Sequence, residues 1–230
     1  MSSDFTFNKH DEIRGKHALF SPSQSAWVRY DEGKIADRVR NQYRTPLGTE
    51  IHDFAASQIE LGHRYTSVRE IKKEIETYIY AKYTFLSEDL KISEYGKKLL
   101  IYLKFVPKEV LEVTMCYIND GIRYGMNVEQ GLKYSEFVYG HADTICFKNN
   151  ILRIHDLKTG DGPAHIEQLK LYAALFCLEY VIKPSTIKIE LSLYHWDEIT
   201  QLEPDLEEII NLMDSIIKAT NISQEVEKEN

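Results

Sequence analysis

The sequence lacks any long apolar segment. None of its apolar runs approaches the roughly 18 residues that a transmembrane helix needs, so we expect no membrane partner. The first 17 residues carry no apolar stretch of the kind found in a signal peptide. From these two absences we expect a cytoplasmic protein.

Cysteine is scarce, and its placement argues against a cysteine-bound cofactor. Cys116, Cys146 and Cys177 are far apart, odd in number and set among apolar neighbours. No Cys-x-x-Cys pair occurs, so we expect reduced thiols and neither an iron–sulfur cluster nor a cysteine-type zinc site. The pattern Gly-x-x-x-x-Gly-Lys-[Ser/Thr] is also missing, which excludes a P-loop for nucleotide phosphates.

Basic charge is not in excess either. The chain has 28 basic and 36 acidic side chains and a formal net charge of −8, which argues against a protein that coats nucleic acid by bulk electrostatics. The acidic excess is concentrated in residues 203–230, which hold eight acidic side chains and two lysines. The rest of the chain is close to neutral and can still hold a local basic groove.

A chain of 230 residues, 43% of them hydrophobic, can bury the core of one domain. Its first half has mainly helical spacing, and its second half contains the β-branched and aromatic runs of strands. We expect a break at 46–49, disorder at 221–230, and either helix or strand over 110–118. The expected helices are 50–59, 66–84, 87–105, 164–181 and 203–219, and the expected strands are 133–139, 141–147, 151–159 and 185–196.

Three side chains suited to metal and phosphate chemistry lie on two neighbouring strands. Residues 148–150 predict a tight turn, so the start of strand 141–147 lies beside the end of strand 151–159. Alternation then brings Asp143 close to Asp156 and Lys158. Two such carboxylates repel each other unless a hard cation such as Mg²⁺ or Mn²⁺ binds them, and Lys158 can orient or deprotonate a water. For an isolated Asp-x-Lys, a buried salt bridge is the common explanation.

Polar side chains elsewhere extend this pattern. Gln168 and Tyr172 are four apart on the following helix, so they share a face and can hydrogen-bond a phosphate; a helix cap and a core residue are the alternative. His52 lies beside the apolar stripe of its helix, where an isolated histidine is usually structural. Ser23 stands at an expected helix start, where a hydroxyl caps the helix or contacts a phosphate.

The combination resembles the PD-(D/E)xK nuclease superfamily, in particular its RecB-like and phage-exonuclease branch. The similar motifs, within segments 20–60 and 133–196, are Gly48-Thr49-Glu50-Ile51-His52, Gly140-His141-Ala142-Asp143, His155-Asp156-Leu157-Lys158-Thr159-Gly160 and Gln168-Leu169-Lys170-Leu171-Tyr172-Ala173. The resemblance implies an α/β fold with a restriction-endonuclease-like core, a mixed β-sheet flanked by helices. Residues 1–230 would form a single nuclease domain, with 66–125 as a helical insertion and 203–219 as a C-terminal helix.

The resemblance also implies a role for each site residue. Asp143 and Asp156 would bind Mg²⁺ or Mn²⁺ together with the backbone carbonyl of Leu157, and His52 would complete the ligand set. Lys158 would activate the attacking water. The scissile phosphate would be positioned by Gln168 and Tyr172, with Ser23 as a further contact. Glu136, expected one strand earlier, would be a supporting carboxylate or a ligand of a second ion.

These roles predict a divalent-metal-dependent deoxyribonuclease, above all an exonuclease of recombination or repair in a bacterial or phage-infected cell. Its partner would be DNA, and a single-strand annealing or recombination protein is a candidate second partner. The sequence leaves a homo-oligomer open. Two alternative functions stay open as well. One is a catalytically inactive DNA- or protein-binding module on the same fold, which the acidic composition favours, and the other is a structure-specific endonuclease.

Overall fold

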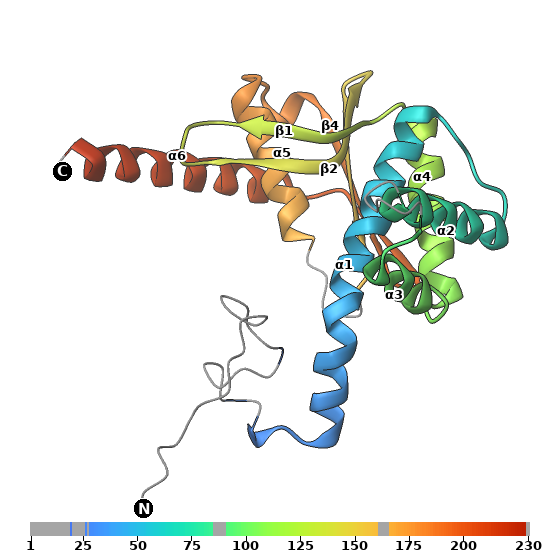
Figure 1. The fold of residues 1–230 in the computed structure, drawn as a ribbon. Coiled ribbons are helices and arrows are strands. Elements are labelled where there is room, and N and C mark those ends of the chain that lie inside the picture. The colour runs from blue at the N-terminus through green and yellow to red at the C-terminus, as the bar shows by residue number, and fades with distance from the viewer. Residues whose placement is uncertain (1–18, 20–25, 27, 85–90, 161–165, 229–230) are drawn as a thin grey trace, which may run out of the picture. The chain divides into compact units, whose positions relative to one another are not determined.

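The computed structural model of the protein describes residues 19, 26, 28–84, 91–160 and 166–228. Contacts divide the chain into two units, Met1–Thr45 and Pro46–Asn230, and each is described by itself. The first unit contains the beginning of helix α1 (Glu32–Leu61), and the sheet and the other helices belong to the second unit (Figure 1). None of the described helices has the length and apolar character needed to cross a membrane.

The second unit is built on one mixed sheet of five strands in the order β1-β2-β3-β4-β5. Strands β3 and β4 pair in parallel, and the other neighbours pair antiparallel. The β2–β3 hairpin turns at Asn149 and Asn150, whose φ angles of 53° and 59° fit the tight polar turn expected there. The strands are β1 (Asn127–Lys133), β2 (Tyr139–Lys148), β3 (Ile151–Lys158), β4 (Lys188–His195) and β5 (Glu198–Leu202).

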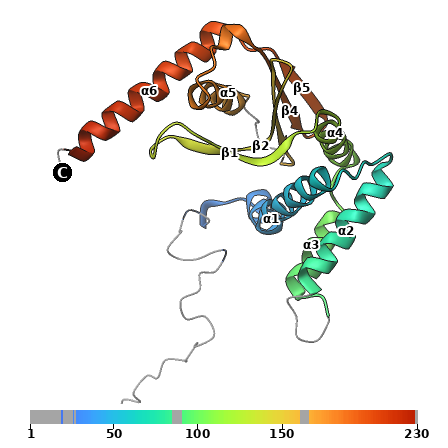
Figure 2. The same cartoon turned by 90° about the horizontal axis from the view of Figure 1, so that it is seen from above.

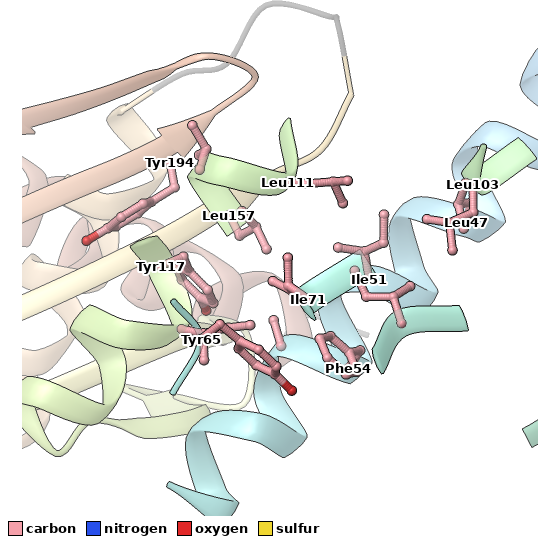
Figure 3. Close-up of a cluster of buried hydrophobic side chains, with 14 of the residues drawn as sticks. Leu47, Ile51, Phe54, Tyr65, Ile71, Leu103, Leu111, Tyr117, Leu157 and Tyr194 are labelled. Carbon is pink, nitrogen blue, oxygen red and sulfur yellow. The ribbon is translucent and has the colours of Figure 1, made fainter. Parts of the chain in front are cut away.

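One face of the sheet packs against a layer of helices. This layer contains α1 from Pro46 onward, α2 (Val68–Thr84), α3 (Glu94–Leu103) and α4 (Lys108–Tyr124). Their buried apolar side chains form one cluster, which the sheet joins through Leu157 of β3 and Tyr194 of β4 (Figure 3). The helices expected to be an insertion therefore share a core with α1 and with β3.

The other face is covered by α5 (Glu167–Glu179) and α6 (Leu206–Lys228). Helix α5 lies in the crossover that a parallel β3–β4 pair requires, followed by the short helix η3 (Pro184–Thr186). Its buried side chains pack on Ile154, Leu191 and Leu193 of the sheet, and Figure 2 shows α5 and α4 on opposite sides of it. The predicted fold class, an α/β protein with a restriction-endonuclease-like mixed sheet flanked by helices, is confirmed.

The structure corrects the expected boundaries at the N-terminal side and settles one ambiguity. The break predicted at 46–49 is wrong, because α1 is continuous through Pro46; one proline removes a single bond of the helical ladder. Residues 110–118 are helical, as part of α4, whose apolar residues line up on one buried face between Pro107 and Gly125. Helix α3 begins after Ser93, which caps it, so the described residues 91–93 precede the helix predicted from 87.

Two further predictions in the second half are wrong. Most of the strand expected over 133–139 is a turn: residues 134–138 join β1 to β2. The Ser135 hydroxyl accepts hydrogen bonds from the N–H groups of Phe137 and Val138 and so competes with strand pairing. The disorder expected over 221–230 is contradicted as far as Lys228, the last residue of α6. This helix packs mainly on α5, with Ile209 and Ile216 buried in their shared cluster, and a 3.0 Å hydrogen bond joins Thr220 to Ser135 of the β1–β2 turn.

Candidate active site

Two aspartates face each other where the β2–β3 ladder ends. The last paired residues are Thr144 and His155, so Asp143 and Asp156 are the next residues on the two strands and project to the same face. Asp156 is only 2% exposed, and the side chain of Asp143 is 19% exposed. The hairpin therefore holds two carboxylates together in a largely dehydrated place.

The Asp143 side chain also hydrogen-bonds the backbone of β3. Its Oδ2 accepts a 3.2 Å hydrogen bond from the N–H of Leu157. The N–H and C=O of one strand residue point to the same side of the strand, so the Leu157 carbonyl also points toward the carboxylates and away from the β4 ladder. The Leu157 carbonyl oxygen is therefore a third oxygen donor beside the carboxylates of Asp143 and Asp156.

Lys158 lies at the end of β3 and pairs with the buried carboxylate. Its Nζ is 2.9 Å from both oxygens of Asp156. Apart from this ion pair, the buried Oδ2 has no hydrogen-bond partner among the described residues. The ammonium group therefore supplies one positive charge beside the two carboxylates.

His52 reaches this group from α1. Its Nδ1 lies 3.6 Å from Oδ2 of Asp143, and the ring also hydrogen-bonds the backbone of Leu157. Gly48, one turn earlier, permits the close approach of α1 to the end of β3, because a Cβ there would lie 2.8 Å from Oγ1 of Thr159. The histidine and the glycine upstream of it thus act together in the geometry of the site.

Helix α5 adds two polar side chains on the same side of the sheet. The Oε1 of Gln168 lies 3.5 Å from Nζ of Lys158, and the Gln168 amide donates to the Tyr172 hydroxyl at 3.3 Å. The Tyr172 ring packs over Gly140 of β2, where a Cβ would lie 3.0 Å from its Cε1. A continuous polar path therefore runs from Asp156 through Lys158 to Tyr172.

Burial and mutual repulsion shift the pKa values of this group. Loss of hydration, followed by the charge of Asp143, raises the pKa of Asp156 to about 6. Burial likewise raises the pKa of Asp143. Burial lowers the pKa of His52, and the nearby carboxylates do not overcome that effect. At neutral pH the imidazole is therefore neutral and keeps the lone pair that a metal ligand needs.

The donor set fits a hard divalent cation. Two carboxylates, a backbone carbonyl and a neutral imidazole converge, and one buried carboxylate oxygen has no hydrogen bond of its own. Over the described ranges, no three His, Cys, Asp or Glu side chains already stand at metal-binding spacing. The Lys158 ion pair explains this, since the ammonium holds the Asp156 carboxylate that a cation would share with Asp143.

Two residues predicted for the site are not part of this group. Ser23 lies outside the described residues. Glu136 is exposed and lies in the 134–138 turn, because the strand predicted around it does not exist. The register instead places Glu129 of β1 opposite Asp143, with a positive φ of 47°. Its charge contributes to the raised pKa of Asp143, and no motif in the sequence pointed to it.

The fold and the site define the chain as an α/β protein with a mixed five-stranded sheet and a buried Asp143–Asp156–Lys158 group at one end of it. The family model described as "Protein of unknown function (DUF2800)" matches residues 17–227, and the chain belongs to this family. No curated protein and no solved structure matches the chain.

Proposed function

We propose that this protein is a Mg²⁺- or Mn²⁺-dependent deoxyribonuclease that hydrolyses phosphodiester bonds at the end of β3. The observation that carries the proposal is the convergence of His52, Asp143, Asp156 and the Leu157 carbonyl beside Lys158. These residues come from three separate elements, and their burial raises the energy of the uncompensated carboxylates. A structural salt bridge requires neither the second aspartate nor the histidine.

In this proposal each side chain has a distinct task. Asp143, Asp156, His52 and the Leu157 carbonyl hold the cation, which when bound polarises the phosphate and lowers the pKa of a water. Lys158 orients that water and stabilises negative charge that develops on the phosphate. Gln168 and Tyr172 donate hydrogen bonds to phosphate oxygens and so fix the DNA strand next to Lys158.

The finer features of the predicted function belong to this proposal too. The enzyme acts as an exonuclease in recombination or repair, in the cytoplasm of a bacterium or of a phage-infected host. Its macromolecular partner is DNA, with an annealing or recombination protein as a second partner. Incubation with linear and with covalently closed circular DNA separates this activity from that of a structure-specific endonuclease, because an exonuclease needs an end.

The proposal is tested by DNA cleavage with Mn²⁺ or with EDTA, together with calorimetric titration of Mn²⁺ into the wild type and His52→Ala. We expect cleavage that EDTA abolishes, measurable Mn²⁺ binding to the wild type, and binding at least about tenfold weaker without the imidazole ligand. Absence of both Mn²⁺ heat and cleavage on every DNA form would instead favour a catalytically inactive binding module.

A further inference from the structure

A cavity of about 380 Å³ lies away from the candidate active site, against strands β3, β4 and β5. Its lining includes His155, which neighbours Asp156 on β3 and therefore points to the opposite face of the sheet. Tyr124, the last residue of α4, forms a wall. The cavity shares no residue with the group proposed for DNA cleavage.

The floor of the cavity contains a row of three polar side chains. His155 pairs with Ser192 in the β3–β4 ladder, and Ser192 pairs with Gln201 in the β4–β5 ladder. Ladder partners project to the same face, so the imidazole, the hydroxyl and the amide stand side by side. His155 is 2% exposed, yet its Nδ1 has no hydrogen-bond partner among the described residues. An unpaired buried nitrogen is unfavourable unless a ligand or water supplies the missing bond.

The charged side chains around this row neutralise one another. Arg153 Nε lies 2.7 Å from Glu190 Oε2, and Lys188 Nζ lies 3.0 Å from Glu190 Oε1. Lys188 also pairs with Glu203, which lines the cavity too. No cation of the lining is left over for a phosphate, and two carboxylates would repel one. The cavity therefore favours an uncharged ligand with several hydrogen-bonding groups.

The walls favour a flat ligand. The guanidinium carbon of Arg153 lies 4.5 Å from the centre of the Tyr124 ring. The His155 ring meets the same tyrosine edge-on, with an interplanar angle of 85° and centroids 5.9 Å apart. Guanidinium and aromatic planes are the surfaces on which nucleic-acid bases stack.

We propose that this cavity binds an uncharged planar heterocycle of the nucleobase class. Its hydrogen-bonding edge meets His155, Ser192 and Gln201, and its face lies against the Tyr124–Arg153 pair. An apolar ligand would leave the His155 nitrogen unpaired, and an anion would meet Glu190 and Glu203. The cavity is independent of the proposed nuclease site, because the two sites share no residue.

Calorimetric titration of adenosine into the full chain tests the proposal, with ribose and adenosine monophosphate as comparison ligands. We expect adenosine to bind in the micromolar to low millimolar range, about −4 to −8 kcal/mol, more tightly than adenosine monophosphate, with no heat from ribose. Gln201→Ala, an exposed position that does not endanger folding, should weaken adenosine binding about five- to tenfold, as expected for one lost hydrogen bond. His155→Phe keeps a flat ring and should weaken it at least as much.

Thr200→Val is the matched control, since it is adjacent to Gln201 but points to the other face of β5. It should leave adenosine binding unchanged. The proposal is overturned if adenosine gives no binding up to its solubility limit, if ribose binds as well as adenosine, or if Gln201→Ala and Thr200→Val bind adenosine equally. Cleavage of DNA by Gln201→Ala at the wild-type rate would show that the two sites are independent.

Discussion

Two buried carboxylate–lysine pairs lie in this protein, and they differ in what surrounds them. In the first, Glu50 of α1 is 5% exposed, accepts a 2.8 Å hydrogen bond from the Tyr83 hydroxyl through Oε1, and pairs with Lys82 at 2.8 Å through Oε2. Lys82 is shared with Asp53 at 3.0 Å, and its pKa is raised by these acids. Lys82 therefore faces two carboxylates, and the second of them, Asp53, is 48% exposed and stays hydrated.

The second pair, Asp156–Lys158, has a similar distance of 2.9 Å but different surroundings. Its second carboxylate, Asp143, is also largely buried, with a side chain 19% exposed. Burial, together with the charge of Asp143, raises the pKa of Asp156 to about 6. The first pair joins α1 to α2 and supports the fold. The second stores unfavourable electrostatic energy that a cation would relieve, which is typical of functional sites. The two pairs are similar in burial and distance, and Glu50 Oε2 and Asp156 Oδ2 both lack a hydrogen bond beyond the ion pair. They differ in the second carboxylate, which is hydrated at Asp53 and largely buried at Asp143.

The largest expected effect is on DNA cleavage, which should depend on Lys158 but not on Lys82. Lys158→Met should lower the rate of Mn²⁺-dependent DNA cleavage by at least about 100-fold, because it removes the group that orients water and stabilises the phosphate charge. Lys82→Met, the same substitution in the Glu50–Lys82 pair, should leave the turnover of the folded protein close to that of the wild type. Equal losses in the two variants would contradict the separation.

The next effect is on stability, where the loss of Lys82 should cost more than the loss of Lys158. Lys82→Met leaves Glu50 buried without its cation and should lower the free energy of unfolding by about 3 kcal/mol. Lys158→Met should lower it by only about 1 kcal/mol at pH 7, because Asp156 already has a pKa of about 6 and can take up a proton. Urea unfolding of both variants measures the difference, and a larger loss for Lys158→Met would refute this explanation.

The pH dependence of stability, measured without metal, tests whether the surroundings of Asp156 disfavour its charged form. The pKa of Asp156 is raised in the folded state, so the folded protein binds this proton more tightly than the unfolded chain does. Its contribution to stability is complete below about pH 4 and is lost as the pH rises to about 6, by about 3 kcal/mol. His52, with a lowered pKa, acts in the opposite sense.

The contribution of Asp156 is therefore measured as the difference in the free energy of unfolding between the wild type and Asp156→Asn, both in EDTA. This difference should change across pH 4 to 6 and be constant above about pH 7. A difference that does not vary over that range would mean that Asp156 is not strained by its surroundings.

The smallest effect concerns the approach of α1 to the site. Alanine in place of a helical glycine normally stabilises by about 1 kcal/mol, but at Gly48 the new Cβ would lie 2.8 Å from Thr159 Oγ1. Gly48→Ala should therefore change the free energy of unfolding by less than about 0.5 kcal/mol. In a Thr159→Ala background the full gain should appear. The same gain in both backgrounds would show that α1 and the end of β3 are not in close contact.

The sequence predicted the local parts of the site better than their assembly. The hairpin, the Asp-x-Lys strand and the Gln168–Tyr172 face follow from turn chemistry and from strand and helix periods. Strand β1 was missed because Asn127–Lys133 carries few β-formers, and the aromatic 133–139 segment took its place. The expected Glu136 was displaced with it, and Glu129 became visible only through the register with β2.

Long-range contacts account for the rest. His52 is separated from Asp143 by the whole α2–α4 region, and its distance of 3.6 Å depends on how α1 packs through Ile51 and Phe54. Neither the helix period nor the neighbouring residues contain that information. Only the family resemblance pointed to His52. The surroundings of the Glu50–Lys82 pair were equally invisible, because Tyr83 and Asp53 join it only in the packed helices.

The central claim is that the buried carboxylate of Asp156, at the end of β3, helps to hold a cation that is needed for DNA cleavage. Mn²⁺-dependent cleavage of a linear DNA fragment by Asp156→Asn, compared with Glu50→Gln at equal concentrations of folded protein, tests it most directly. We predict that Glu50→Gln cleaves at a rate near that of the wild type and that Asp156→Asn shows no cleavage above the EDTA background. Cleavage by Asp156→Asn at the wild-type rate would contradict the claim.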